Sequence, residues 1–120
     1  GDLAIFQSTE FFTKAMFGQA NFSDAVYFTE TTFTEKAMFT YTKFKKAVFN
    51  NAKFDEAGLF TNAEFTKKAE FINAKFKDLV NFDNTSFDEV DFEGTKFSII
   101  PTITNALVKN VDIFSYKLQN

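Results

Sequence analysis

The sequence contains no cysteine, no histidine, no arginine and no tryptophan, and it has one proline among its 120 residues. Without cysteine it has no disulfide, no thiol nucleophile and no thiolate metal site. The absence of histidine removes the usual general base and the commonest ligand of transition metals. Without arginine there is no guanidinium to bind phosphate or guanine in a bidentate manner. We therefore expect no catalytic residue, no cofactor and no metal site.

Long apolar runs are also missing, because no stretch approaches the ~18 residues that a membrane-spanning helix needs. The isolated glycines Gly18, Gly58 and Gly94 form no phosphate-binding loop. We expect a cytoplasmic protein without a membrane segment. The chain opens with Gly1 and Asp2 in place of methionine, which is consistent with a trimmed or replaced N-terminus.

Phenylalanine is abundant instead: there are 20, and from Phe12 onwards one recurs every five or six residues. On a helix, five residues advance by about 140°, so these rings would spread around the cylinder. On a straight strand, an odd spacing would place them on alternate faces. All rings can face one way only if the chain turns a corner once per repeat, and such a chain forms coils that stack as a solenoid. The series is Phe12, Phe17, Phe22, Phe28, Phe33, Phe39, Phe44, Phe49, Phe54, Phe60, Phe65, Phe71, Phe76, Phe82, Phe87, Phe92 and Phe97.

A small residue precedes most of these rings by two positions, as in Ala47-Val48-Phe49-Asn50-Asn51 and Ala52-Lys53-Phe54-Asp55-Glu56. This unit resembles the repeat of the pentapeptide-repeat proteins. The resemblance implies an all-β fold: a right-handed quadrilateral parallel β-helix, here of about four to five coils. It also implies that the ring and the small residue point inward while the other positions face water. We expect this β-helix to occupy residues 1–97.

The six-residue spacings between rings follow an order. If Phe17 lies on the first side of a four-sided coil, all five rings that end such a spacing fall on odd-numbered sides. These rings are Phe28, Phe39, Phe60, Phe71 and Phe82. We predict that the additional residues lie on two opposite sides, as bulges or wider corners at fixed places. Random insertion with a drifting register is the alternative.

Residues 98–120 break the pattern, and we expect them to form a separate C-terminal segment. Pro101 is the only proline, and it cannot continue a hydrogen-bonded ladder. Apolar residues then recur at spacings of three or four, as on one face of an amphipathic helix. These residues are Ile103, Leu107, Val111, Phe114 and Leu118. We predict a C-terminal α-helix with Thr102 or Thr104 as its N-cap, which either covers the last coil or contacts a second copy or a partner.

Charge is distributed in blocks along the chain. Residues 36–77 hold nine lysines and four acids, whereas residues 78–97 hold one lysine and six acids. Because each coil stacks on the preceding one, these blocks become a basic layer followed by an acidic layer. The densest acidic group is a candidate interaction surface: Asp83, Asp88, Glu89, Asp91 and Glu93. An ordinary solvated face that keeps the protein soluble is the alternative.

The expected function is a non-enzymatic scaffold for protein–protein interaction whose partner is unknown. A basic band at Lys45-Lys46 and Lys67-Lys68 could touch phosphates, but acids interleave with it, and we expect no direct nucleic-acid binding. We expect a monomer or an end-to-end dimer, with the first coil around Leu3, Ile5 and Phe6 as the contact. A module cut from a larger protein is a further possibility.

Some members of the family that the chain resembles mimic duplex DNA and protect gyrase or topoisomerase IV, and this is the alternative function. Such mimicry needs a long and strongly acidic rod. This chain has a net charge of −3 and a basic middle block, which favours the scaffold over the mimic.

Overall fold

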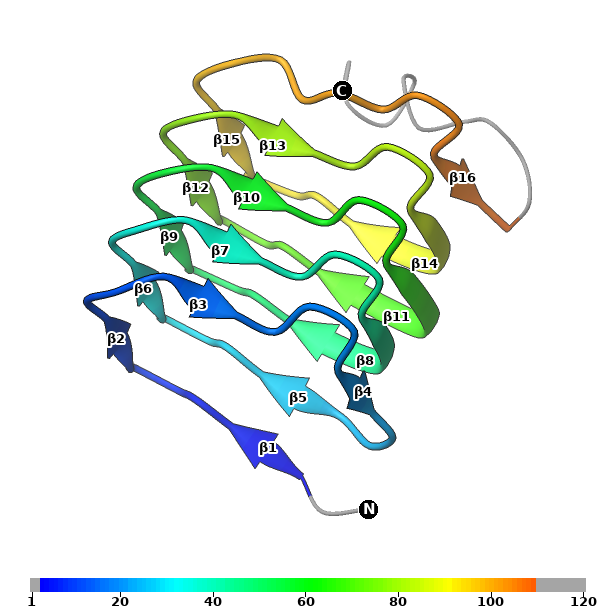
Figure 1. Cartoon of the computed structure of the whole chain (residues 1–120), viewed down its shortest axis with the longest axis horizontal. Coiled ribbons are helices and arrows are strands. Elements are labelled where there is room, and N and C mark those ends of the chain that lie inside the picture. The colour runs from blue at the N-terminus through cyan, green and yellow to red at the C-terminus, as the bar shows by residue number, and fades with distance from the viewer. Residues whose placement is uncertain (1–2, 110–120) are drawn as a thin grey trace.

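The computed structural model describes residues 3–109, and in this range the chain forms about five stacked coils of short strands without any helix (Figure 1). The strands are β1 (Ala4–Ile5), β2 (Glu10–Phe11), β3 (Ala15–Met16), β4 (Asn21–Phe22), β5 (Val26–Tyr27), β6 (Thr32–Phe33), β7 (Ala37–Met38), β8 (Lys43–Val48), β9 (Lys53–Phe54), β10 (Gly58–Leu59), β11 (Glu64–Glu70), β12 (Lys75–Phe76), β13 (Val80–Asn81), β14 (Ser86–Asp91), β15 (Lys96–Phe97) and β16 (Leu107–Val108). The expected all-β parallel solenoid is therefore confirmed.

The strands form three parallel sheets, each of which collects one or two sides of successive coils. One has the order β1-β5-β8-β11-β14-β16, with β4 paired to β8, and the others have the orders β13-β10-β7-β3 and β15-β12-β9-β6-β2. The first sheet is the largest because β8, β11 and β14 each run for six or seven residues. These three strands continue around a corner and so belong to two sides of the coil.

The phenylalanine rings stack in four columns inside the coils, one for each side. Side 1 holds Phe6, Phe28, Phe49, Phe71 and Phe92; side 2 holds Phe11, Phe33, Phe54, Phe76 and Phe97; side 3 holds Phe17, Phe39, Phe60 and Phe82; and side 4 holds Phe22, Phe44, Phe65 and Phe87. Successive rings of a column are stacked with centroids 4.5 to 5.4 Å apart. The four-sided coil and the inward rings are thus confirmed.

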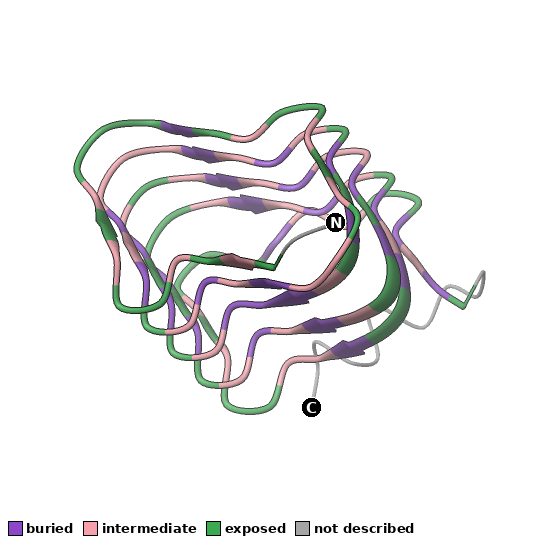
Figure 2. Cartoon of the chain, turned by 90° about the horizontal axis from the view of Figure 1, so that it is seen from below, coloured by how far each residue is buried: buried purple, intermediate pink, exposed green. Residues whose placement is uncertain are grey.

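These columns and the small residues beside them make up the core (Figure 2). In the middle coils the rings are fully buried, as at Phe49 and Phe54, and burying one ring contributes ~1.5–3 kcal/mol. The inward threonines Thr31 and Thr85 are buried as well, and each hydroxyl donates to a phenylalanine carbonyl of the preceding coil at 2.6 Å. Their polar groups are satisfied, so the interior accepts them.

Two kinds of corner connect the sides. A tight corner follows each ring of sides 1 and 3, where a backbone N–H bonds back to the ring residue's carbonyl three positions earlier, as from Ala63 to Phe60 at 2.9 Å. The second residue after the ring then has positive φ, for example 61° at Asn62. Asparagine tolerates this left-handed conformation better than most residues. We call the corners after sides 2 and 4 open corners.

Ring spacing follows the type of corner. Across a tight corner the next ring always comes five residues later, as from Phe60 to Phe65. Most open corners contain one more residue, so the next ring comes six residues later, as from Phe65 to Phe71. Phe28 and Phe71 stack on side 1, and the other three predicted rings, Phe39, Phe60 and Phe82, stack on side 3. The prediction that the six-residue spacings end on two opposite sides is confirmed.

The expected start of the ring series at Phe12 is wrong. Phe12 points outward and is 71% exposed, whereas its neighbour Phe11 stacks on Phe33 at 5.2 Å. The reason is that β2 pairs with β6, which aligns Phe11 with Phe33. The corner from Phe11 to Phe17 is then another open corner of six residues.

The predicted helix is wrong for the part of residues 102–120 that the structure describes. Ile103 packs against the core, and Leu107 lies in β16, which pairs with β14 in the seven-stranded sheet. Val108, aligned with Phe87, takes the place of a ring on side 4. The coil therefore runs past Phe97 to Lys109. Val111, Phe114 and Leu118 lie outside the described residues.

Pro101 does not interrupt this path because it occupies the inward position two residues before Ile103, where it is buried. At the equivalent position two coils earlier, the N–H of Gly58 donates to Leu79 of the following coil. The amide that proline lacks would thus point away from the preceding coil. Thr102, the next residue, donates normally to Val80 at 3.0 Å. A proline at such an edge position costs no ladder bond.

Candidate interaction surface

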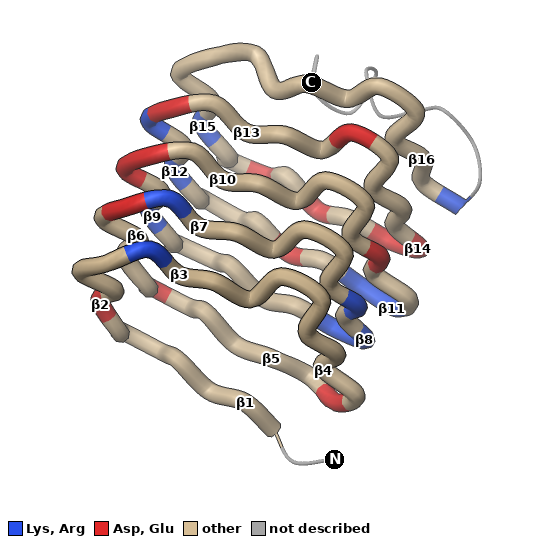
Figure 3. Tube along the Cα trace, viewed as in Figure 1, with Lys and Arg blue, Asp and Glu red and all other residues tan. Residues whose placement is uncertain are grey.

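Charged residues occur along all the coils, and most lysines lie on two opposite sides, as the coloured positions along the trace show (Figure 3). On side 2, Lys53, Lys75 and Lys96 lie at equivalent positions because β9, β12 and β15 pair in register. Side 4 and its open corner carry more lysines within two adjacent coils. We call this group the lysine cluster: Lys43, Lys45, Lys46, Lys67 and Lys68.

The lysine cluster depends on a β-bulge. In β11 the register with β8 shifts between Phe65 and Lys68, because Phe71 follows Phe65 by six residues while Phe49 follows Phe44 by five. The bulge lets Lys68 align with Lys46 and leaves Lys67 as an additional outward residue on the same corner. Bulges commonly redirect side chains next to functional sites.

Only part of the positive charge of the lysine cluster is balanced by neighbouring groups. Lys68 Nζ lies 3.8 Å from Glu70 Oε2, and Lys46 Nζ lies 6.0 Å from the ring centroid of Tyr27. Lys43, Lys45 and Lys67 are exposed, and within residues 3–109 the structure shows no ion pair for them. These three ammonium groups are therefore available to an anionic ligand.

A shallow hollow of about 280 Å³ lies beside these three lysines, next to Phe22. Besides Lys43, Lys45 and Lys67, it is lined by the small polar side chains of Asn21, Ser23 and Thr66. The Thr66 hydroxyl also donates to the carbonyl of Phe44 at 3.3 Å, which fixes it to the preceding coil. The lining offers several hydrogen-bond donors and no carboxylate.

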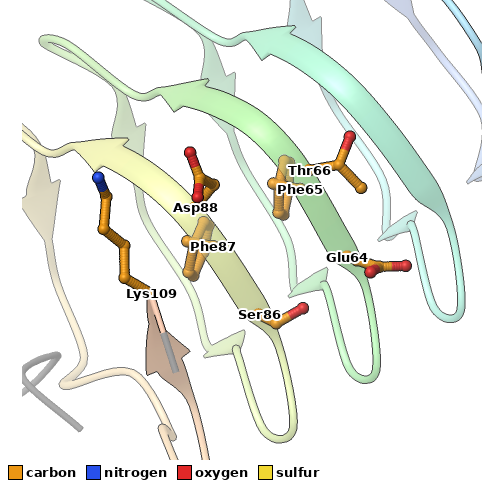
Figure 4. Close-up of a pocket in the computed structure, with 7 residues that line it drawn as sticks. All are labelled: Glu64, Phe65, Thr66, Ser86, Phe87, Asp88 and Lys109. Atoms are coloured by element: carbon orange, nitrogen blue, oxygen red, sulfur yellow. The ribbon is translucent and has the colours of Figure 1, made fainter. Parts of the chain in front are cut away.

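A second hollow of about 220 Å³ continues along side 4 in the following coils (Figure 4). Its polar lining is mixed, with Glu64, Ser86, Asp88 and Lys109. Thr66 lines both hollows, so the two adjoin. Side 4 thus presents two adjoining shallow hollows, of which the first is basic and the second carries both signs of charge.

The predicted acidic surface is only partly assembled. Asp88 and Asp91 belong to β14, together with Glu89 between them. Asp83 follows Phe82 on side 3, where its carboxylate accepts the N–H of Thr104 at 2.9 Å. Glu93 follows Phe92 at the tight corner after side 1, and its own N–H donates to Asp91 at 2.9 Å. The five acids lie in one coil but around several of its sides.

Comparison with known families identifies the repeat. Residues 60–98 match the family described as "Pentapeptide repeats (9 copies)". This segment therefore consists of pentapeptide repeats. No curated protein and no solved structure matches the chain at a significant level. The ring columns continue through the coils on both sides of the matched segment, so the same geometry extends beyond it.

The sequence indicated a basic band at Lys45-Lys46 and Lys67-Lys68, but it did not indicate the hollow or the part that Lys43 plays in it. The interval between equivalent positions of successive coils could have indicated the hollow. Equivalent positions of successive coils are 21 or 22 residues apart, as with Phe44, Phe65 and Phe87. This interval brings Lys45 and Thr66 together on side 4.

Metal-ligand clusters and membrane-spanning helices are both absent from the described part of the chain. Within residues 3–109 no group of three or more acids could hold a metal ion. In the same range the structure contains no helix long and apolar enough to cross a membrane.

Proposed function

We propose that this protein is a non-enzymatic pentapeptide-repeat scaffold that binds a partner protein through side 4. The observation that carries the proposal is the pair of adjoining hollows on side 4. Polar and cationic side chains line these hollows on a rigid backbone. Its coils are fixed from within by stacked rings, such as Phe44 on Phe65 at 4.6 Å and Phe65 on Phe87 at 4.9 Å. A preorganised surface of this kind loses little conformational entropy on binding.

The interior of the coils supports a binding role over a catalytic one. The middle rings are fully buried, and the inward positions between them hold Ala, Gly, Val and Thr. Inward polar groups such as Thr42 and Thr85 are bonded to backbone carbonyls. A core filled in this manner supports the shape of the coils, while the outward residues are left to vary and to recognise a partner.

Site-specific photo-crosslinking tests this function. Thr66 on side 4 and Thr34 on side 2 are matched positions, because each follows its ring directly and each hydroxyl donates to a ring residue's carbonyl in the preceding coil. Either threonine is replaced by a photoreactive phenylalanine analogue in the cells that make the protein. We expect one recurrent protein adduct from position 66 and none from position 34. The adduct must form again with the purified partner.

Two results would contradict the proposed function. The first is the absence of any protein adduct from position 66. The second is the same set of adducts from positions 66 and 34, because random collision does not distinguish the two sides. Far-ultraviolet circular dichroism of both variants confirms that the coils have formed.

A further inference from the structure

We propose that the lysine cluster binds a short, extended, acidic segment of a partner protein, with its carboxylates in the hollow beside Lys43, Lys45 and Lys67. This inference rests on the proposed function, since it names the chemistry of the partner that side 4 receives. It is carried by three observations: the like-charge pairing across β8 and β11, the hollow without carboxylates, and the acids that bound the cluster along the axis.

The first observation is an arrangement that weakens the free fold. Lys46 and Lys68 are aligned partners in adjacent parallel strands, and the rings beneath them, Phe44 and Phe65, are only 4.6 Å apart. Like charges that face each other across strands are destabilising. The bulge in β11 adds Lys67 to the same corner. Glu70 balances part of the charge of Lys68, and an anion bound in the neighbouring hollow would lower the repulsion further.

The second observation is the shape and the chemistry of the hollow. Its volume of about 280 Å³ has room for carboxylate side chains, and three ammonium groups line it. Asn21 and Ser23 of one coil, together with Thr66 two coils later, add amide and hydroxyl donors. An ionised carboxylate is an acceptor with two oxygens, so it matches a lining rich in donors.

The third observation limits the length of the anion. Along the axis, Asp24 lies at the same corner in the preceding coil, and Glu89 is aligned with Lys68 in the following coil. Asp88 lines the adjoining hollow. A long nucleic-acid backbone running along side 4 would meet these carboxylates at both ends of the basic band. A short peptide avoids them, and its alternate side chains, about 6.6 Å apart in an extended strand, can enter the hollow together.

Side 2 provides a matched control. Lys53, Lys75 and Lys96 also form an aligned column of three exposed lysines. Carboxylates lie near both groups of lysines: on side 2 Asp55 is 3.4 Å from Lys77 Nζ, and on side 4 Glu64 is aligned with Lys43. Replacing the three lysines of either side by glutamine changes the net charge equally. A difference between the two triple variants therefore reports the location of binding and not the overall charge.

The experiment is a titration of the isotope-labelled protein with an eight-residue peptide of alternating Glu and Ser, followed by amide chemical shifts at low ionic strength. We expect shift changes centred on Ser23, Lys45 and Thr66. The triple variant Lys43→Gln, Lys45→Gln, Lys67→Gln should weaken binding by about tenfold, as expected for the loss of several exposed ion pairs. The side 2 triple variant should weaken it by less than about twofold. Salt near physiological strength should weaken binding to the unmodified protein as well.

Several outcomes would overturn the inference: no shift changes on side 4 at millimolar peptide, equal weakening by both triple variants, or equally tight binding of an eight-residue oligothymidylate. If the side 4 triple variant does not fold, two measurements still show whether the peptide binds on side 4. They are the map of shift changes on the unmodified protein and the affinity of the single variant Lys45→Gln. A negative peptide result together with a partner adduct from position 66 would reject the acidic segment and leave the scaffold function standing.

Discussion

Sides 1 and 3 differ from sides 2 and 4 in both their packing and their surface. Rings of sides 1 and 3 meet across the centre of the coil: Phe49 contacts Phe39 edge to face at 5.5 Å and Phe60 at 5.7 Å. Within residues 3–109 no ring contact joins side 2 to side 4. On the surface, the lysines of the strands lie on sides 2 and 4, for example Lys53 and Lys43. One pair of sides thus holds the coil together, and the other pair presents its charge.

The largest expected effect comes from removing a ring of the first pair. Phe49→Ala should lower the free energy of unfolding by ~3–5 kcal/mol, because it opens a cavity among rings of all four sides. Phe54→Ala on side 2 should fall near the lower end of that range, since Phe54 has no ring contact with side 4. Urea denaturation measures both. The outward variant Lys53→Ala is the control, and a cost within about 1 kcal/mol of that of Phe49→Ala would reject the assignment of inward and outward positions.

Lengthening a corner by one residue should destabilise the protein more at a tight corner, after side 1 or 3, than at an open corner, after side 2 or 4. One glycine inserted between Asn62 and Ala63 breaks the tight corner that closes through the bond from Ala63 N–H to the Phe60 carbonyl. It also displaces Phe65 from its column, and we expect a loss of ~2–4 kcal/mol from the ring and the hydrogen bond together. One glycine between Asp88 and Glu89, in an open corner of five residues, should cost less than about half as much.

The reason for this difference is that open corners already vary by one residue between neighbouring coils. Along β14 the next ring, Phe92, follows Phe87 by five residues. Along the adjacent β11, which contains a bulge, Phe71 follows Phe65 by six residues. Thermal and urea denaturation of the two insertion variants test the distinction. Equal losses would mean that corner type does not control ring spacing.

Spacing predicted a solenoid, and the resemblance to pentapeptide repeats added the four sides and the small inward residues. The two together predicted the opposite placement of the six-residue corners. It failed where the ring position carries no phenylalanine. Ile103 and Val108 replace the rings of sides 3 and 4, and Ile103 and Leu107 also fit a helical spacing of four, so the helix pattern concealed the continuing coil. The choice of Phe12 was wrong for a different reason. Phe11 and Phe12 are adjacent, so spacing does not decide which of them points inward, and the pairing of Phe11 with Phe33 decides it.

The candidate site was less predictable than the fold. Linear spacing showed lysine pairs, but the hollow depends on which residues of three successive coils meet. That required the exact length of each open corner, including the bulge between Phe65 and Lys68. The acidic group is spread around the coil for a related reason: neighbours in the chain, such as Asp83 and Asp88, lie on different sides once a tight corner separates them. Its role as an interaction surface stays a prediction.

Substitutions of the corner residues should have a smaller effect on stability, and the effect should differ between a tight and an open corner. Glu30, after side 1, has a φ of 58°, whereas Glu56, at the equivalent place after side 2, is not among the described residues with positive φ. Glu30→Asn should stabilise the protein by ~0.5–1 kcal/mol, because asparagine tolerates the left-handed conformation better. Glu56→Asn should stay within about 0.5 kcal/mol of the unmodified protein. A gain at both positions would point to the lost negative charge as the cause and not to the backbone.

The smallest expected effect is none at all, in a gyrase supercoiling assay with and without a quinolone. A protein that mimics duplex DNA must present a continuous negative field. The aligned lysines of side 2, Lys53, Lys75 and Lys96, interrupt that field over three coils, and the lysine cluster interrupts it on side 4. We therefore predict neither inhibition nor protection at micromolar protein and physiological salt. Dose-dependent inhibition or protection would favour the mimic of duplex DNA over the interaction scaffold. The two glutamine triple variants would then show which side had opposed the enzyme, because removing lysines from that side should strengthen the effect.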